Sequence, residues 1–156
     1  MKSLVPNGSW FGNMSRGIWQ DVFIEYRSET YIEDVYINTS VRSRELKLDI
    51  TVKNRGKCPT GKITADIFDF EDPLLNLSAM LSLEEHERKV ITIKHKWGNA
   101  EYWSPEKPKL FKLVISIAKD GEIIDSLCKT FGFREVWLDG YKFILNGMLQ
   151  MNLACL

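Results

Sequence analysis

The chain has 156 residues, in which 21 lysine and arginine residues are balanced by 21 aspartate and glutamate residues. This length is enough for one ordinary domain with its own core and too short for a second complete domain. Because the chain has neither net charge nor a dense basic run, nucleic acid and anionic lipid are not expected as partners.

The N-terminal residues, Met-Lys-Ser-Leu-Val-Pro, lack the sustained apolar stretch of a signal peptide, and no segment is long enough to span a bilayer. The default expectation is a cytoplasmic chain without a membrane partner. The three cysteines Cys58, Cys128 and Cys155 are far apart and do not form a CxxC pair. We therefore expect no metal site and no cofactor, and we expect Cys128 to be a buried apolar thiol inside a strand.

Strict alternation of apolar and polar residues, the period of a half-buried strand, recurs along the chain. The apolar positions that show it are Val35, Ile37 and Val41, then Leu46, Leu48, Ile50 and Val52, then Ile63, Ala65 and Ile67, then Ile91 and Ile93, and finally Phe111, Leu113, Ile115 and Ile117. Turn residues separate these runs at 54–56, 59–61 and 120–121. The pattern predicts an all-β protein.

Two segments refine this prediction. Asp120-Gly121 favours a two-residue type I′ turn, which would pair residues 111–118 with residues 123–130 as an antiparallel hairpin. Residues 77–89 are ambiguous, because their Ala, Met, Leu and Glu content favours helix by propensity. We interpret them as a strand over 77–83, a polar turn at 84–87 and a strand that ends near 96. The sequence then predicts an immunoglobulin-like antiparallel β-sandwich of about seven strands.

Several motifs, in this order, resemble glycoside hydrolase family 2, which includes β-galactosidases, β-glucuronidases and β-mannosidases. They are Trp103-Ser104-Pro105, the run Pro108 to Leu113, Phe131-Gly132-Phe133-Arg134 and Phe143-Ile144-Leu145-Asn146-Gly147. Upstream, residues 17–25 resemble the closing strand of the family's jelly-roll domain, with Gln20 in place of the usual arginine.

The resemblance implies three parts. Residues 1–29 would be the end of a jelly-roll sugar-binding domain, residues 30–134 the immunoglobulin-like sandwich, and residues 135–156 the start of a (β/α)₈ barrel, with a hairpin from Tyr141 to Leu153. Both ends of the chain would then fall inside a domain. The partners implied are the jelly-roll and barrel domains of a parent glycosidase. The interrupted ends also suggest self-association, since unpaired strand edges seek partners.

Catalytic residues are not expected in this chain. Retaining glycosidases use two carboxyl groups about 5 Å apart, and in this family both are glutamates on barrel strands. The family's acid/base follows an asparagine, and the chain contains no Asn-Glu dipeptide.

Aromatic residues are the remaining candidates for a site. The resemblance implies that the loop with Trp10 and Asn13 lies near the sugar subsite of a parent enzyme. Trp103, Phe131, Phe133 and Trp137 are expected to pack at the seam between domains.

Two functions stay open at this point. The first is a non-catalytic spacer between a jelly roll and a catalytic barrel that hydrolyses O-glycosidic bonds. The second is an autonomous carbohydrate-binding or adhesion sandwich that uses exposed aromatic residues as a platform.

Overall fold

The computed structural model describes residues 21–22, 24–57 and 60–152. All regular secondary structure in these residues is β-strand. The strands are β1 (Thr30–Ser40), β2 (Glu45–Asn54), β3 (Thr60–Asp69), β4 (Asp72–Ser82), β5 (Arg88–Lys96), β6 (Phe111–Lys119), β7 (Glu122–Phe131), β8 (Val136–Asp139), β9 (Lys142–Leu145) and β10 (Met148–Asn152).

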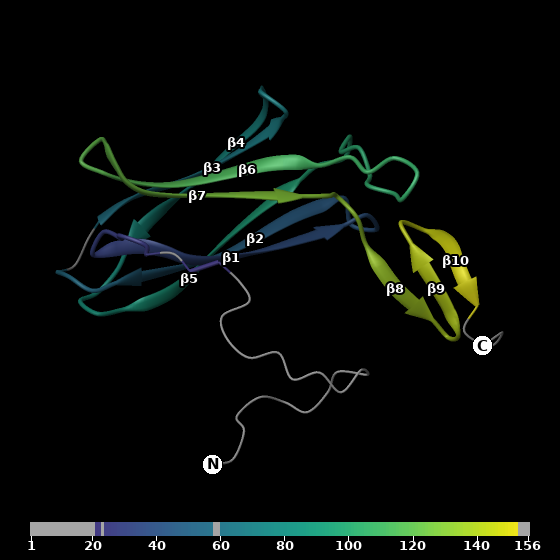
Figure 1. The fold of residues 1–156 in the computed structure, drawn as a ribbon, viewed down its shortest axis with the longest axis horizontal. Helices are drawn as coiled ribbons and strands as arrows, with labels where there is room; N and C mark the ends of the chain where they lie inside the picture. Colours follow the sequence, from purple (N-terminus) through teal and green to yellow (C-terminus); the bar gives the residue numbers. More distant parts are fainter. Residues whose placement is uncertain (1–20, 23, 58–59, 153–156) are drawn as a thin grey trace, which may run out of the picture.

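The first seven strands form two layers that face each other (Figure 1). One sheet has the order β1-β2-β5 and the other the order β4-β3-β6-β7, and every pairing between neighbours is antiparallel. The predicted seven-stranded immunoglobulin-like sandwich is confirmed.

The core lies between these two sheets and follows the alternation in the sequence. On β2, every second side chain is fully buried while the residues between them are half-exposed. Burying a large aliphatic side chain contributes about 1.5 to 3 kcal/mol, so this row is a main source of stability. The apolar residues of β2, β3 and β6 that are 0% exposed are Leu46, Leu48, Ile50, Val52, Ile63, Ala65, Ile67, Leu113, Ile115 and Ile117.

The ambiguous segment 77–89 is strand, turn and strand, as interpreted. β4 pairs with β3 over its whole length, from Thr60↔Ser82 to Asp69↔Asp72, and β5 pairs with β2 in the opposite sheet. β4 begins five residues before the expected start and includes Pro73. Proline is tolerated there because β4 is an edge strand, on which one row of N–H groups has no partner strand.

The turn between β6 and β7 also matches its prediction. Asp120 and Gly121 both have positive φ, 52° and 86°, as a type I′ turn requires. The expectation for Cys128 in β7 is wrong, because its side chain is exposed. Cys128 pairs with Val114 on the outer face of the sheet, so the inward position belongs to its neighbour Leu127. Cys58 and Cys155 lie outside the described residues.

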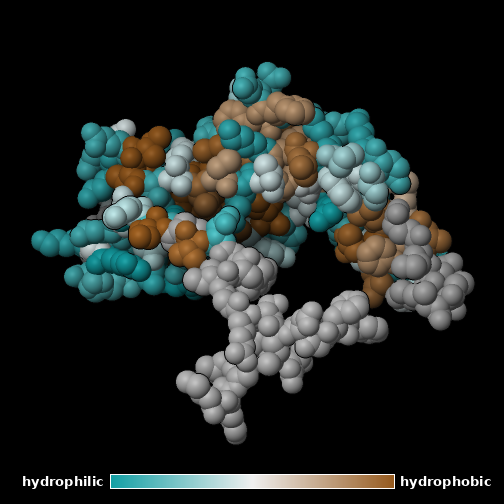
Figure 2. Space-filling view, in the orientation of Figure 1, coloured by the Kyte–Doolittle hydropathy of each residue, from teal (hydrophilic) through white to brown (hydrophobic). Residues whose placement is uncertain are grey.

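A third sheet with the order β10-β9-β8 follows the sandwich and lies beyond its end (Figure 1). The hairpin expected from Tyr141 is present as β9 and β10, and β8 is an additional strand. Apolar side chains gather over this sheet, at the right of Figure 2. Five of its large side chains are between 48% and 61% exposed, namely Val136, Leu138, Tyr141, Met148 and Leu149.

The closing strand that the resemblance implies for residues 17–25 is not formed in the described part of that stretch, residues 21–22 and 24–25. Val22, Ile24 and Tyr26 are 75%, 81% and 94% exposed, so little of their surface is packed. A strand needs a partner for its backbone hydrogen bonds, and the first pairing of the described chain begins at Thr30. This finding concerns one strand only, so the division of the chain into three domains stays a prediction.

Candidate functional site

A set of specific polar contacts lies where β7 leaves the sandwich and the chain enters β8. Four segments meet there: the β1–β2 loop, residues 102–104, residues 132–135 and the β9–β10 turn. We call the hydrogen bonds made there by Glu135 and Asn146 the clasp.

Asn146 forms one half of the clasp from the turn between β9 and β10. Its φ is 53°, a left-handed conformation that asparagine tolerates better than most residues. Its backbone N–H donates to the Glu135 carbonyl at 2.9 Å, and its side-chain Oδ1 accepts from the Glu135 N–H at 2.9 Å. Its Nδ2 donates to the Trp103 carbonyl at 2.7 Å. A single side chain therefore ties the third sheet to two segments of the sandwich.

The Glu135 carboxylate forms the other half and connects to the β1–β2 loop. It accepts hydrogen bonds from Ser40 Oγ at 3.0 Å, from the Arg42 backbone N–H at 3.0 Å and from Arg42 Nε at 2.7 Å. The Arg42 guanidinium also lies over the Trp137 ring on β8, with its Cζ atom 4.7 Å from the ring centroid. Arg42 thus contacts both sides of the junction.

The protonation state of Glu135 follows from these contacts. Burial raises its pKa, since the side chain is only 13% exposed, but the hydrogen bonds from Arg42 and Ser40 outweigh that effect. The net result is a Glu135 pKa below its ordinary value. Glu135 is therefore ionised at neutral pH, which is the form that the clasp requires.

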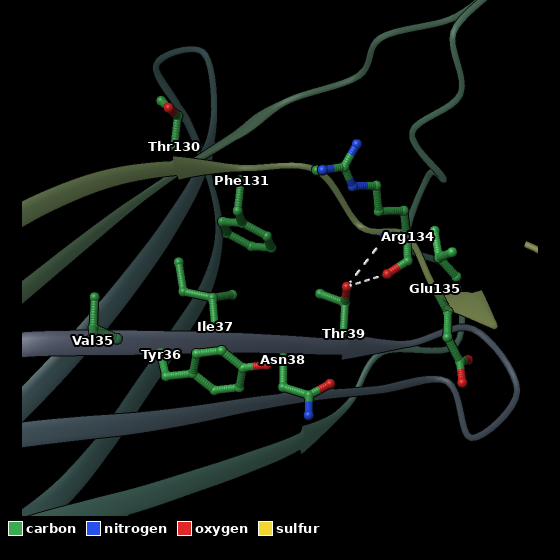
Figure 3. A pocket seen from close by; sticks show the side chains of 11 residues that line it. Val35, Tyr36, Ile37, Asn38, Thr39, Thr130, Phe131, Arg134 and Glu135 are labelled. Atoms are coloured by element: carbon green, nitrogen blue, oxygen red, sulfur yellow. Dashed lines mark hydrogen bonds between the residues drawn. The ribbon is translucent and has the colours of Figure 1, made fainter. Parts of the chain in front are cut away.

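The loop before β6 closes on the same junction. The Trp103 N–H donates to the Phe133 carbonyl at 2.9 Å, and the Arg134 guanidinium lies 4.4 Å above the Trp103 ring. Gly132 allows this approach, because a Cβ at that position would lie 2.8 Å from the Cβ and Cγ atoms of Trp103. The Thr39 hydroxyl donates to the Arg134 carbonyl at 2.6 Å and joins β1 to the same segment (Figure 3).

The four aromatic residues predicted for a seam lie in different surroundings. Phe133 is fully buried and Phe131 is 8% exposed, and both belong to the sandwich core. Trp103 and Trp137 are half-buried and each lies under an arginine at the junction. Whether these residues pack against further domains stays a prediction.

The predicted sugar-proximal residues, Trp10 and Asn13, lie outside the described residues. The contacts of the clasp were not predicted from the sequence, although Asn146 belongs to the motif from Phe143 to Gly147. The Asn146-Gly147 dipeptide is a recognisable signal of a hairpin turn and marks Asn146 as a left-handed residue. Glu135 shows no comparable signal, because its partners are more than 90 positions away in the chain.

A groove of ≈ 500 Å³ opens between β1 and β7 beside the junction (Figure 3). Ile37 and Phe131 point toward one another across it, and the Thr39 contact with Arg134 lies at one end. Of the residues that line this groove in the described part of the chain, Glu135 is the single acid. Its carboxylate is engaged by Arg42, so the groove does not offer the two converging carboxyl groups of a glycosidase.

Over the described ranges, no three His, Cys, Asp or Glu residues are grouped so that they could hold a metal ion. Nothing helical in the same part of the chain is long and apolar enough to cross a membrane.

The fold and its junction define a class: an immunoglobulin-like sandwich domain that leads directly into a further β-sheet, to which it is hydrogen-bonded. Comparison with known proteins identifies the family. Residues 30–134 match the family described as glycosyl hydrolases family 2, and the chain belongs to that family.

The relatives are much longer than this chain. It is 24% identical over 139 residues to a β-galactosidase of Streptococcus thermophilus, a match that covers 84% of this chain and 13% of the relative. A β-galactosidase of Clostridium acetobutylicum is 27% identical over 121 residues, which is 76% of this chain and 13% of the relative. The crystal structure of a family 2 β-galacturonidase from Eisenbergiella tayi, bound to galacturonate, aligns with a TM-score of 0.67 and 25% identity, covering 78% of this chain and 22% of that one.

Proposed function

We propose that this chain acts as the non-catalytic sandwich of a family 2 glycoside hydrolase and holds a jelly-roll domain and a catalytic barrel in fixed positions. The parent protein would be a retaining glycosidase that hydrolyses O-glycosidic bonds. Its jelly-roll and barrel domains would then be the partners of this chain.

The clasp is the observation that carries this proposal. A spacer transmits position only if its two ends are rigidly connected, and the loop-to-sheet contacts of Glu135 and Asn146 supply that connection. The contacts come from four segments distant in sequence, so bending at the junction would break several hydrogen bonds at once.

The apolar residues of the β8–β10 sheet support the same proposal. The three-stranded sheet has five large apolar side chains that are about half exposed to solvent. Such an apolar surface is suited to packing against a further domain. Burial of such a face contributes about 25 cal/mol per Å² of apolar area removed from water.

Two measurements on the purified chain test the proposal. Amide hydrogen exchange should show that the β8–β10 amides are protected and that Asn146→Ala exposes them while the β2 and β6 amides stay protected. If the β8–β10 amides exchange as fast in the unaltered chain as in Asn146→Ala, the rigid spacer is refuted. Hydrolysis of a chromogenic β-galactoside or β-glucuronide by the chain alone would refute its non-catalytic role.

We also propose that the isolated chain self-associates through the β8–β10 sheet, whose outer strands β8 and β10 each pair with one strand only among the described residues. Light scattering across a concentration series should show a rising mean mass. A monodisperse monomer at every concentration would refute this proposal.

A further inference from the structure

The two-residue turn between β3 and β4 carries an unusual phenylalanine. Phe70 is 84% exposed, and its φ is 55°, in the left-handed region that favours glycine or asparagine. The turn projects from the four-stranded sheet at the top of Figure 1. A two-residue turn accounts for the positive φ itself. What calls for a reason is an exposed phenylalanine at a position where glycine or asparagine would be less strained.

The Phe70 ring lies beside Lys109, which belongs to a group of charged side chains that pair with one another. Lys109 Nζ lies 2.6 Å from both carboxylate oxygens of Asp69 and 5.5 Å from the centroid of the Phe70 ring. Glu101 bonds to Lys107 and lies 3.8 Å from Lys109. Lys109 is only 17% exposed, and the Asp69 contact raises its pKa, so the ammonium stays charged and in place.

This arrangement indicates the class of ligand. The two acids and two lysines cancel in charge, while Glu71 on the turn and Asp72 at the start of β4 add negative charge, so an anion would be repelled. The fixed carboxylates accept hydrogen bonds and the ammonium groups donate them, which matches hydroxyl groups that do both. An exposed ring face suits a flat apolar surface. A neutral pyranose sugar combines these properties, since it has C–H groups on one face and hydroxyls at its edge.

We propose that Phe70, with Asp69, Lys109 and Glu101 beside it, forms a surface binding site for a neutral sugar. This proposal does not depend on the spacer role, because Phe70 lies on the β3–β4 turn and makes none of the clasp hydrogen bonds. The site would let the sandwich hold a glycan chain at its surface.

The test is a titration of the full 156-residue chain with β-1,4-galactotetraose, followed by backbone amide NMR shifts. Saturable shifts are expected at residues 69–72 and 109–110 with a Kd of about 1 mM, the weak range of a contact that involves about a dozen ligand atoms. Tetragalacturonate serves as the negatively charged comparison ligand and should bind about tenfold more weakly than the neutral galactotetraose. Absence of shifts at the turn, or equal binding of the uronate, would overturn the proposal.

Three variants separate binding from stability. Phe70→Ala should weaken binding about tenfold, whereas the control Tyr36→Ala, which removes a 65% exposed ring from the other sheet, should leave binding unchanged. Phe70→Gly should also lose binding but raise the melting temperature, because glycine relieves the positive φ. Retained sugar binding in Phe70→Ala, or a lower melting temperature in Phe70→Gly, would contradict the proposal that the Phe70 ring binds sugar at a cost in stability.

Discussion

Substitution of Phe133 tests whether the segment that leads out of the sandwich is also part of the sandwich core. The side chain is 0% exposed, stacks on Tyr102 with 5.7 Å between ring centroids and meets Trp97 edge-on at 5.6 Å. Truncation of a fully buried phenylalanine to alanine removes the transfer free energy of the ring and leaves a cavity. We therefore expect Phe133→Ala to lower the free energy of unfolding by about 4 kcal/mol.

For a chain of this length, a loss of that size lowers the melting temperature by about 8 to 16 °C. Differential scanning calorimetry and urea unfolding measure the change, and the urea midpoint should fall without a change in slope. Phe70→Ala is the matched control, because it deletes the same atoms from an 84% exposed position and should not destabilise the chain. A loss below about 1 kcal/mol in Phe133→Ala, or equal losses in both variants, would refute the assignment of Phe133 to the core.

Three further predictions concern the junction and the surface. Gly132→Ala should destabilise the chain by about 1 to 3 kcal/mol, since its Cβ would lie 2.8 Å from Trp103. The control Gly98→Ala has open space around the new Cβ and should not destabilise the chain. Equal melting temperatures of the two variants would contradict the close approach of Gly132 to Trp103. Glu135→Gln should be less stable than the unaltered chain at pH 7. Because the folded-state pKa of Glu135 lies below the ordinary value of 4.5, this difference should shrink as the pH falls through that lower pKa, and a difference constant from pH 7 to pH 3 in urea titrations would argue against the ionised clasp. Iodoacetamide should label Cys128 in the folded chain at a rate close to that in urea, as peptide mapping would show, and strong protection would contradict its exposed position.

The strands were predictable because side-chain alternation and sheet geometry share a period of two residues. Leu46 to Val52 and Phe111 to Ile117 have inward positions that are buried without exception. The Asp120-Gly121 turn was predictable for a related reason, since few residue pairs adopt two consecutive positive φ values.

Where local signals conflict, long-range pairing decides the structure. The helix-favouring residues of 77–83 are held as strand because Leu77 and Ala79 pair with Ala65 and Ile63 of β3. The exposure of Cys128 was not predictable. A register shift between Ile117 and Ala118 changes which β7 side chains face inward, and a β-bulge of this kind has no clear sequence signal.

The clasp could not have been predicted from this sequence alone. Its hydrogen bonds join Ser40 and Arg42 to Glu135 across more than 90 positions, and Trp103 to Asn146 across 43. Ser40, Arg42 and Glu135 belong to no recognised motif, and the motifs that contain Trp103 and Asn146 do not indicate that these two residues meet. Asn146 was quoted as part of a family motif, yet its role at the junction depends on the Trp103 carbonyl and the Glu135 backbone.

Residual dipolar couplings of the backbone N–H groups measure directly whether the sandwich and the β8–β10 sheet are rigidly connected. The couplings from β2, β3 and β6 define one alignment tensor, and we expect the same tensor to fit the couplings of β8 and β9 with no loss of magnitude. In Asn146→Ala, the β8 and β9 couplings should shrink while the sandwich values persist. Reduced couplings for β8 and β9 in the unaltered chain would show a flexible joint and refute the rigid connection.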